Sequence, residues 1–440
     1  MKLRYATLIV SFVLAVGQSF AQQWTLDQCI EYAIAHNIDI QQKALLVKQQ
    51  DIDLNTSHNG WLPEVNAEIA EQFSFGNYNA ANGSMNGTKS DVSRNLAYTT
   101  GGVSAAINVF DGFKVKNSIK ADKFSLDAAT ADLERARKDI GIQVATYYLQ
   151  CLYYKNMVSV ARAQVDVSKE MLKRATVLVD EGKRPLSDKK DLEATVASDE
   201  YSLADAEGQF TLSLLSLAQL LNLPMNNNFD VAEVPETTML EQNADAIYEN
   251  IVEQWPAITS AKSRIDENRA RVEIARSAYY PTLSLQAGIR TFYVNMFHQN
   301  MGWGGFGDQF FDNNLNEVIG LHLNVPIFNR FETRNNIRRA KLKVVSSELN
   351  LEDSRLNLRK EIETAYTNYH VAKNKLAFVE KAVDAAAISV AYEKDRYDAG
   401  KGSIFDVQQA QQKLLKAQQD AVQTKFEYLI RQRILDFYKK

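Results

Sequence analysis

Four segments of the chain alternate apolar and polar residues with a period of two, which predicts strands with one apolar and one polar face. They lie at about 63–76, 98–110, 281–293 and 317–328. In the first segment Val65, Ala67 and Ile69 alternate with polar or small residues, and Glu71 breaks the pattern. Each segment reaches about 9 to 13 residues, the length that a tilted strand needs to cross a bilayer. An apolar face toward lipid and a polar face toward a water-filled interior are typical of an outer-membrane barrel.

Four predicted strands are too few for a closed barrel. They would form an open sheet with two unpaired edges, which the hydrocarbon of a membrane does not tolerate. Closed bacterial barrels begin at about eight strands, so several copies of the chain must each contribute four. A dimer with eight strands and a trimer with twelve both satisfy this requirement. A soluble sandwich is the alternative, but no residues remain to form its second sheet.

Long helices are predicted at about 112–181, 186–222, 332–399 and 403–438. Between 114 and 180 the sequence has no proline and a single glycine, Gly141. A helix of this length would extend roughly 100 Å at about 1.5 Å per residue. Apolar residues such as Val407, Ala410 and Leu414 recur at spacings of three and four and form a narrow stripe, which is typical of coiled-coil packing. A coiled-coil structural protein is the simpler alternative, but it leaves the four strands unexplained.

The two halves of the sequence repeat one another with a constant offset. Pro63 is matched by Pro281, and Gly182 by Gly400, each pair separated by 218 positions. The matched segments are far longer than the units of a solenoid, so we expect two pseudo-equivalent halves, 22–223 and 244–440, joined by a linker at 224–243. Each half contains, in order, a helix, a strand, a loop, a second strand, a very long helix, a tight turn and a last helix.

The first residues have the features of a secretory signal peptide. Lys2 and Arg4 precede an apolar run at 6–16, and small residues follow at 19–21. We expect residues 1–21 to be removed and the protein to leave the cytoplasm. Cys29 and Cys151 lie on different predicted helices, and we interpret them as separate packing thiols, with a disulfide formed after export as the alternative.

Composition and motifs exclude several classes of function. The net charge is −4 and the predicted pI is 5.9, so nothing favours a nucleic acid as a partner. No catalytic constellation or nucleotide-binding loop occurs, and we expect neither enzyme activity nor a cofactor. The histidines form no pair at metal-ligand spacing on one helix, so we expect no metal site; they are His36, His58, His298, His322 and His370.

The chain resembles the TolC family of outer-membrane efflux proteins over essentially its whole mature length. The resemblance lies in the duplicated order of helices and strands and in two local signatures. One is the sequence LDQCIEYA at 26–33, followed by Asn37. The other is RYDAGKGSIFDV at 396–407, which is similar to the family's second periplasmic tip.

This resemblance implies a fold and a function. The fold would be mainly α with a transmembrane β-barrel contribution, and three copies would form a 12-stranded barrel continued by a 12-helix barrel in the periplasm. The homotrimer would sit in outer-membrane lipid as the passive exit duct of a tripartite efflux or type I secretion system. Its partners would be a periplasmic adaptor and an inner-membrane transporter. The alternative is a periplasmic coiled-coil adaptor or structural protein without a pore.

The resemblance also implies a gate at the periplasmic tips of the helices. Positions matching the family's gate residues are Asp188, Tyr397 and Asp406, and those matching its adaptor-contact turns are Gly182, Lys183, Gly400 and Lys401. Three copies of Asp406 would form an acidic ring that attracts cations. An acid in the first turn of a helix also favours the helix dipole, and this is the structural alternative for Asp188 and Asp406.

Two positions depart from the family's gate pattern. An acidic residue often found three positions after Asp406 is replaced by Gln409. The place of a gate arginine is taken by Gly402. The set of contacts that closes the family's gate, here called the clasp, is therefore only partly present. Lys401 or Arg184 would have to replace the missing charge.

Overall fold

The computed structural model describes residues 23–75, 77–79, 91–93, 95–224, 229–234, 243–297 and 304–439. The expected signal peptide at 1–21 and part of the expected linker at 224–243 lie outside these residues. The chain divides into two compact units. The helical unit comprises Met1–Val47, Ala129–Ser260 and Leu351–Lys440, and the sheet unit comprises Lys48–Ala128 and Ala261–Asn350.

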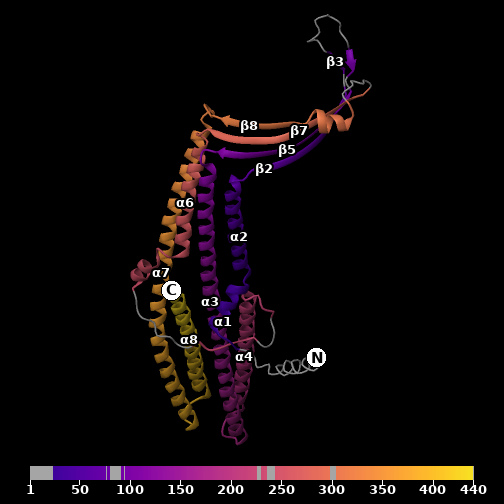
Figure 1. The fold of residues 1–440 in the computed structure, drawn as a ribbon. Coiled ribbons are helices and arrows are strands. Elements are labelled where there is room, and N and C mark those ends of the chain that lie inside the picture. Colours follow the sequence, from indigo (N-terminus) through magenta and orange to yellow (C-terminus); the bar gives the residue numbers. More distant parts are fainter. Residues whose placement is uncertain are drawn as a thin grey trace, which may run out of the picture. The chain divides into compact units, whose positions relative to one another are not determined.

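The sheet unit contains one four-stranded antiparallel sheet. Its strands are β2 (Glu64–Ser74), β5 (Leu96–Phe110), β7 (Thr282–Met296) and β8 (Asn316–Asn324), in the order β2-β5-β7-β8 (Figure 1). β8 ends earlier than the expected 328, and Pro326, two residues further on, has no N–H to donate to a ladder. The two predicted hairpins thus lie side by side through the pairing of β5 with β7, while β2 and β8 are the edge strands.

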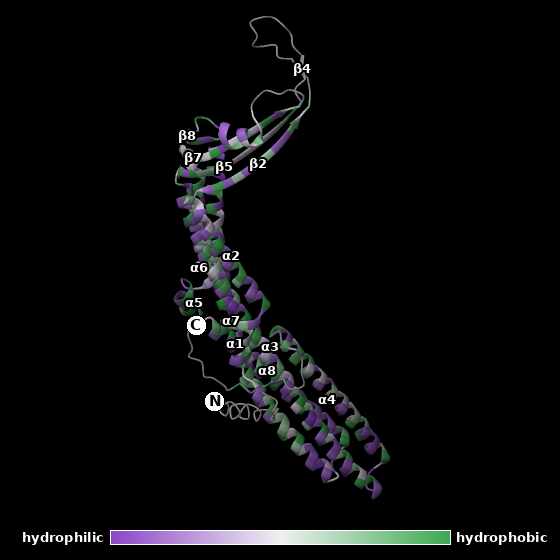
Figure 2. Cartoon of the chain, turned by 45° about the vertical axis from the view of Figure 1, so that its right-hand side comes forward, coloured by the Kyte–Doolittle hydropathy of each residue, from purple (hydrophilic) through white to green (hydrophobic). Residues whose placement is uncertain are grey.

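The register places most of the apolar residues of the four strands on one face, with Val318 among the exceptions. Val103 of β5 pairs with Ala67 on one side and with Ile289 on the other, and Leu285 of β7 pairs with Leu321 of β8. Apolar and polar segments alternate along these strands in Figure 2. Ile69 is 80% exposed and Ile319 is 81% exposed, so this chain by itself leaves much of the apolar face uncovered. The glutamate that breaks the pattern, Glu71, accepts a hydrogen bond from the hydroxyl of Thr99 on the neighbouring strand.

Smaller elements complete the sheet unit. Strands β3 (Asn77–Asn79) and β4 (Asp91–Ser93) pair with each other, and a short π-helix, η3 (Asp308–Asn313), precedes β8. Phe310 of η3 packs over Gly101, where a Cβ would lie 2.6 Å from the ring. A 3-10 turn, η2 (Asn59–Trp61), leads into β2.

The helices account for most of the chain. They are α1 (Leu26–His36), α2 (Ile38–His58), α3 (Lys114–Asp180), α4 (Leu186–Leu220), α5 (Ala244–Ile251), α6 (Pro256–Ser277), α7 (Glu332–Asp398) and α8 (Ile404–Phe437). α3 and α7 each have 67 residues, and α7 begins 218 positions after α3. Within the described part of the chain, none of the helices combines the length and the apolar character needed to cross a membrane.

The core of the helical unit is held to the start of the chain by a polar network. β1 (Gln23–Trp24) pairs in parallel with β6 (Asp230–Val231), a strand inside the expected linker. The hydroxyl of the fully buried Tyr148 lies 2.7 Å from the Trp24 carbonyl, and the Lys155 ammonium lies 2.8 Å from the Asp230 carboxylate. These hydrogen bonds fasten both strands to α3, so part of the linker is ordered structure.

Both cysteines are free thiols buried in this same core. The alternative of a disulfide between them is therefore wrong for this structure. Burial raises the pKa of Cys29 to about 12 and that of Cys151 to about 11. Because the thiolate is the reactive form, both act as small apolar packing residues.

Candidate gate at the tips of the helical hairpins

The turns that reverse the two long hairpins have the same backbone design. Gly182 and Gly400 have φ angles of 70° and 71°, a region that L side chains rarely adopt. The N–H of Lys183 donates to the Leu178 carbonyl at 2.9 Å, and the N–H of Lys401 donates to the Arg396 carbonyl at 2.9 Å. Together with the bonds from the glycine N–H groups, these contacts form a Schellman motif at the end of each long helix. The four predicted turn residues therefore stop α3 and α7.

A small apolar cluster joins the two hairpins at this end. It contains residues of all four helices, namely Ala175 from α3, Leu192 from α4, Tyr397 from α7, and Ile404 and Val407 from α8, with Met171 and Leu172 packed against it. Leu192 and Val407 are each 1% exposed. The packing brings together residues that are more than 200 positions apart in the sequence.

Arg184 makes the most specific contact between the two hairpins. Its guanidinium lies over the ring of Tyr397, 4.3 Å from the centroid, and its Nη2 donates to the Tyr397 carbonyl at 3.1 Å. A planar guanidinium on an aromatic face combines cation–π attraction with stacking, which a lysine cannot reproduce. Arg184 is thus the basic residue that the structure places at the clasp.

Asp188 and Tyr397 lie close enough to interact electrostatically. Asp188 is 9% exposed, in the first turn of α4, where its N–H lies 3.2 Å from the Pro185 carbonyl. Burial raises the pKa of Tyr397, the Arg184 charge lowers it, and the Asp188 charge raises it. The Tyr397 hydroxyl is buried without a hydrogen-bond partner among the described residues. The structure therefore brings together two of the three predicted gate residues, beside an arginine.

Asp406 has a local role in the same chain. The N–H of Ser403 donates to the Asp406 carboxylate at 3.2 Å, and the N–H of Asp406 donates to the Ser403 hydroxyl at 3.2 Å. This reciprocal pair is a capping box at the start of α8. Hydrogen bonds from Ser403 lower the pKa of Asp406. The structural alternative, an acid stabilising a helix start, thus describes what this side chain does within one chain.

The glycine at the family's arginine position has a steric explanation. A Cβ at Gly402 would lie 3.2 Å from the Tyr397 nitrogen and 3.3 Å from the Arg396 carbonyl carbon. The turn therefore approaches the end of α7 closely at this point, and a side chain would have to push it away.

Two polar contacts between the hairpins have no signal in the sequence. Gln408 Nε2 donates to the Thr195 hydroxyl at 3.2 Å, and Gln411 Nε2 lies 2.8 Å from Met171 Sδ. Their partners are 213 and 240 positions away, and the residue types are ordinary for exposed helices. In contrast, the Ser403-x-x-Asp406 spacing is a visible sign of a helix start.

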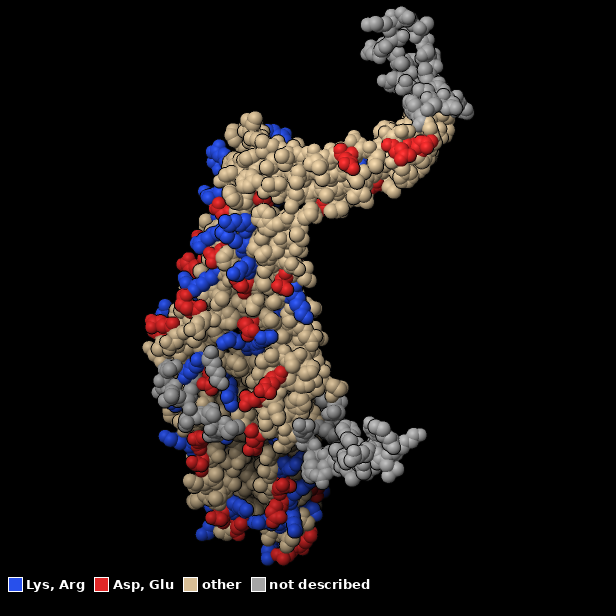
Figure 3. Space-filling view, viewed as in Figure 1, with Lys and Arg blue, Asp and Glu red and all other residues tan. Residues whose placement is uncertain are grey.

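Charged side chains are distributed differently over the molecule's two kinds of structure. In the view of Figure 3, acidic and basic residues alternate over the long helices, whereas the sheet surface shows few charges of either sign. At one tip Lys183 pairs with Glu181 at 2.7 Å, both exposed. No group of three or more possible metal ligands occurs among the described residues.

Comparison with known proteins gives a consistent result. The model of the family described as outer membrane efflux protein matches residues 29–223 and 247–438. The chain is 20% identical over 428 residues to the outer membrane efflux protein BepC of Brucella suis, covering 97% of this chain and 87% of BepC. It is 22% identical over 339 residues to the outer membrane protein TolC of Vibrio cholerae, covering 74% of each. Its fold is similar to the crystal structure of the outer membrane protein VceC of Vibrio cholerae, with a TM-score of 0.74, 18% identity, and coverage of 94% of this chain and 96% of VceC.

Proposed function

Because the chain belongs to the outer membrane efflux protein family, we propose that it is the passive exit duct of a tripartite efflux or type I secretion system. It is an outer-membrane channel protein and not an enzyme. The resemblance inferred from the sequence is thereby confirmed, and the alternative of a pore-less adaptor or structural protein is not supported.

The open sheet carries the proposal for assembly. β2 and β8 end the four-stranded order, and each has one edge without a partner strand among the described residues. An outer-membrane protein cannot leave such edges in lipid. Pairing β8 of one copy with β2 of the next would satisfy both edges, and would also turn the apolar face toward lipid and the polar face toward the lumen. Three copies would close a 12-stranded barrel.

The equal lengths of α3 and α7 support two pseudo-equivalent halves. In a trimer they would provide six long helices, and α4 and α8 the rest of a 12-helix periplasmic barrel. The halves are 22–223 and 244–440, with the linker 224–243 between them and residues 1–21 removed as a signal peptide. Each half alone has too few strands and helices to close either barrel.

The tip is the proposed gate. Arg184 on the first hairpin and Tyr397 on the second hold the two hairpins together, with Asp188 beside them. Separating the hairpins would break this contact and widen the periplasmic end. A ring of three Asp406 carboxylates is a second, separate feature of the proposed gate, and it would require the carboxylate to serve the lumen as well as the helix cap.

The partners follow from the relatives. OpmQ of Pseudomonas aeruginosa is named as a pyoverdine export outer membrane protein, and AprF of the same organism as an alkaline protease secretion protein. We propose a periplasmic adaptor that contacts the turns at Gly182, Lys183, Gly400 and Lys401, and an inner-membrane transporter that supplies the energy. The exposed lysines next to the tip glycines offer such an adaptor charged contacts.

Reconstitution tests the assembly and the duct together. Purified mature protein is examined by native mass spectrometry in detergent and then inserted into a planar bilayer. Three copies per particle and discrete conductance steps are expected. Particles without conductance, even after Tyr397→Ala loosens the tip, would contradict a duct.

The acidic ring is tested in the same bilayers. Block by a trivalent cation added on the periplasmic side should weaken in Asp406→Asn. Unchanged block in a variant that still conducts would eliminate the ring and leave Asp406 with its capping role alone.

A further inference from the structure

A row of side chains crosses the polar face of the sheet and carries opposite charges. Glu68 of β2 is opposite Gly102 of β5, Gly102 is opposite Arg290 of β7, and Arg290 is opposite Asn316 of β8. Residues directly opposite one another on adjacent strands point to the same face. The acid and the base are therefore two strands apart on one face, with a glycine between them.

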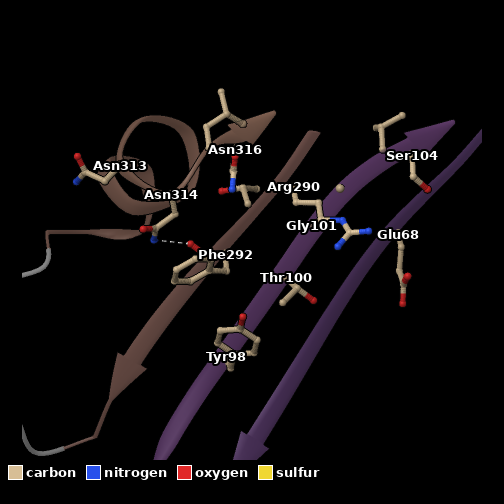
Figure 4. A pocket seen from close by; sticks show the side chains of 14 residues that line it. Glu68, Tyr98, Thr100, Gly101, Ser104, Arg290, Phe292, Asn313, Asn314 and Asn316 are labelled. Carbon is tan, nitrogen blue, oxygen red and sulfur yellow. Dashed lines mark hydrogen bonds between the residues drawn. The ribbon is translucent and has the colours of Figure 1, made fainter. Parts of the chain in front are cut away.

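The glycine determines how these charges are arranged. A Cβ at Gly102 would lie 2.9 Å from the Ile289 carbonyl oxygen and 3.4 Å from Arg290 Cγ. Because this space is free of a side chain, the stem of Arg290 rests over β5. In Figure 4 the guanidinium lies over β5 and extends toward Glu68 on the next strand. The row lines a hollow of about 850 Å³ whose other polar walls include Thr100, Ser104 and Asn314.

Arg290 is unusual for its position. It is the only lysine or arginine in the four strands β2, β5, β7 and β8. It is exposed, and it has no ion-pair partner within the part of the chain that the structure describes. A guanidinium presents several N–H donors in a fixed plane that suits carboxylate and phosphate groups. Its charge is therefore available to a solute at this face.

We propose that Arg290 is the selectivity-determining residue of the strand segment, where it binds carboxylate or phosphate groups of passing solutes, and that Glu68 opposes it. This inference rests on the proposed function, since it requires the polar face to line a lumen. In a trimer, three Arg290 and three Glu68 side chains would form two adjacent rings of opposite sign. Rings of charged side chains are a usual means of ion selection in pores.

The test is the ion selectivity of the reconstituted channel at neutral pH. Reversal potentials are measured under a KCl gradient at low salt, where screening is weak. Arg290→Gln should lower the permeability of chloride relative to potassium by about sevenfold. One unit charge about 7 Å away in water changes the permeability of each ion by a factor of about 2.7, and the changes for chloride and potassium have opposite directions. Arg290→Lys should keep most of the wild-type ratio, and the effect of Arg290→Gln should shrink in molar salt.

Two further variants make the test specific. Glu68→Gln should raise the permeability of chloride relative to potassium. If Arg290→Gln fails to insert into the bilayer, the result for Glu68→Gln decides the test. Glu71→Gln removes the same kind of charge from the same strand but from the apolar face, and it should leave the ratio unchanged.

The outcomes separate the two proposals. A protein that never conducts, even after Tyr397→Ala loosens the tip, would overturn the proposed function. A conducting channel in which Arg290→Gln and Glu68→Gln both keep the wild-type selectivity would overturn this inference alone. A shift in Glu71→Gln as large as that in Glu68→Gln would also overturn it.

Discussion

Removing the guanidinium of Arg184 should release the tip. In Arg184→Ala the ring of Tyr397 loses a cation at 4.3 Å, and its carbonyl loses a donor at 3.1 Å. A partly exposed cation–π contact contributes about 1 kcal/mol, and a hydrogen bond from a charged donor at a partly exposed site contributes about 1 kcal/mol more. The closed arrangement should therefore lose about 2 kcal/mol per chain, or roughly 30-fold in the ratio of closed to open tips.

The assay is the open probability of single channels in a planar bilayer, supported by uptake of a large polar dye into vesicles that contain the protein. Arg184→Ala should raise both. Arg184→Lys keeps the charge but not the planar stacking, so it should fall between Arg184→Ala and the wild type. The matched control is Lys183→Ala, which removes the adjacent cation, paired with Glu181 on its own turn. An unchanged open probability in Arg184→Ala would refute the role of the Arg184–Tyr397 contact in closing the tip. An equal increase in Lys183→Ala would refute it as well.

The remaining predictions concern single side chains. Because its hydroxyl has no hydrogen-bond partner within the described residues, Tyr397→Phe should match the wild type in open probability and melting temperature. Tyr397→Ala, which removes the ring, should open the tip and lower the melting temperature, and equal effects of the two substitutions would contradict this account. The pKa of Asp406 is lowered by hydrogen bonds from Ser403, so its capping contribution is present above the ordinary carboxyl pKa and is lost as pH falls through the lowered value. Hydrogen exchange at the start of α8 should therefore quicken on acidification relative to Asp406→Asn, and an identical pH dependence in both proteins would argue against the capping box. Burial raises the pKa of Cys29 to about 12 and that of Cys151 to about 11, so neither should react with iodoacetamide at pH 8 until the protein is unfolded; rapid labelling of the native protein would show that the core is more open than described.

The candidate gate was only partly visible in the sequence. Gly182 and Gly400 could be identified as turn residues because a reversal after a long helix requires a left-handed residue, which is a local property. Asp188 and Tyr397 were found through resemblance, and the structure places them together. The resemblance assigns Asp406 to the lumen. The structure adds its hydrogen bonds with Ser403, which the Ser403-x-x-Asp406 spacing indicates in the sequence.

Arg184 shows why the rest could not be predicted. Its sequence neighbours indicate only a basic residue after a helix-ending turn. Its partner is 213 positions away, and the contact exists because four helices pack around Leu192 and Val407. Such a contact depends on long-range packing, and the residues next to Arg184 or Tyr397 in the sequence do not indicate it.

The sequence by itself determined the strands, the long helices and the tight turns, because these depend on hydrogen bonds and side-chain periodicities within a few residues. It also indicated that four strands cannot close. Only the tertiary structure decided that β5 pairs with β7, which places Arg290 beside Gly102 and in one row with Glu68. It likewise decided that Arg184 covers Tyr397. Both arrangements join residues from opposite halves of the chain, and the packing of whole strands and helices selects them.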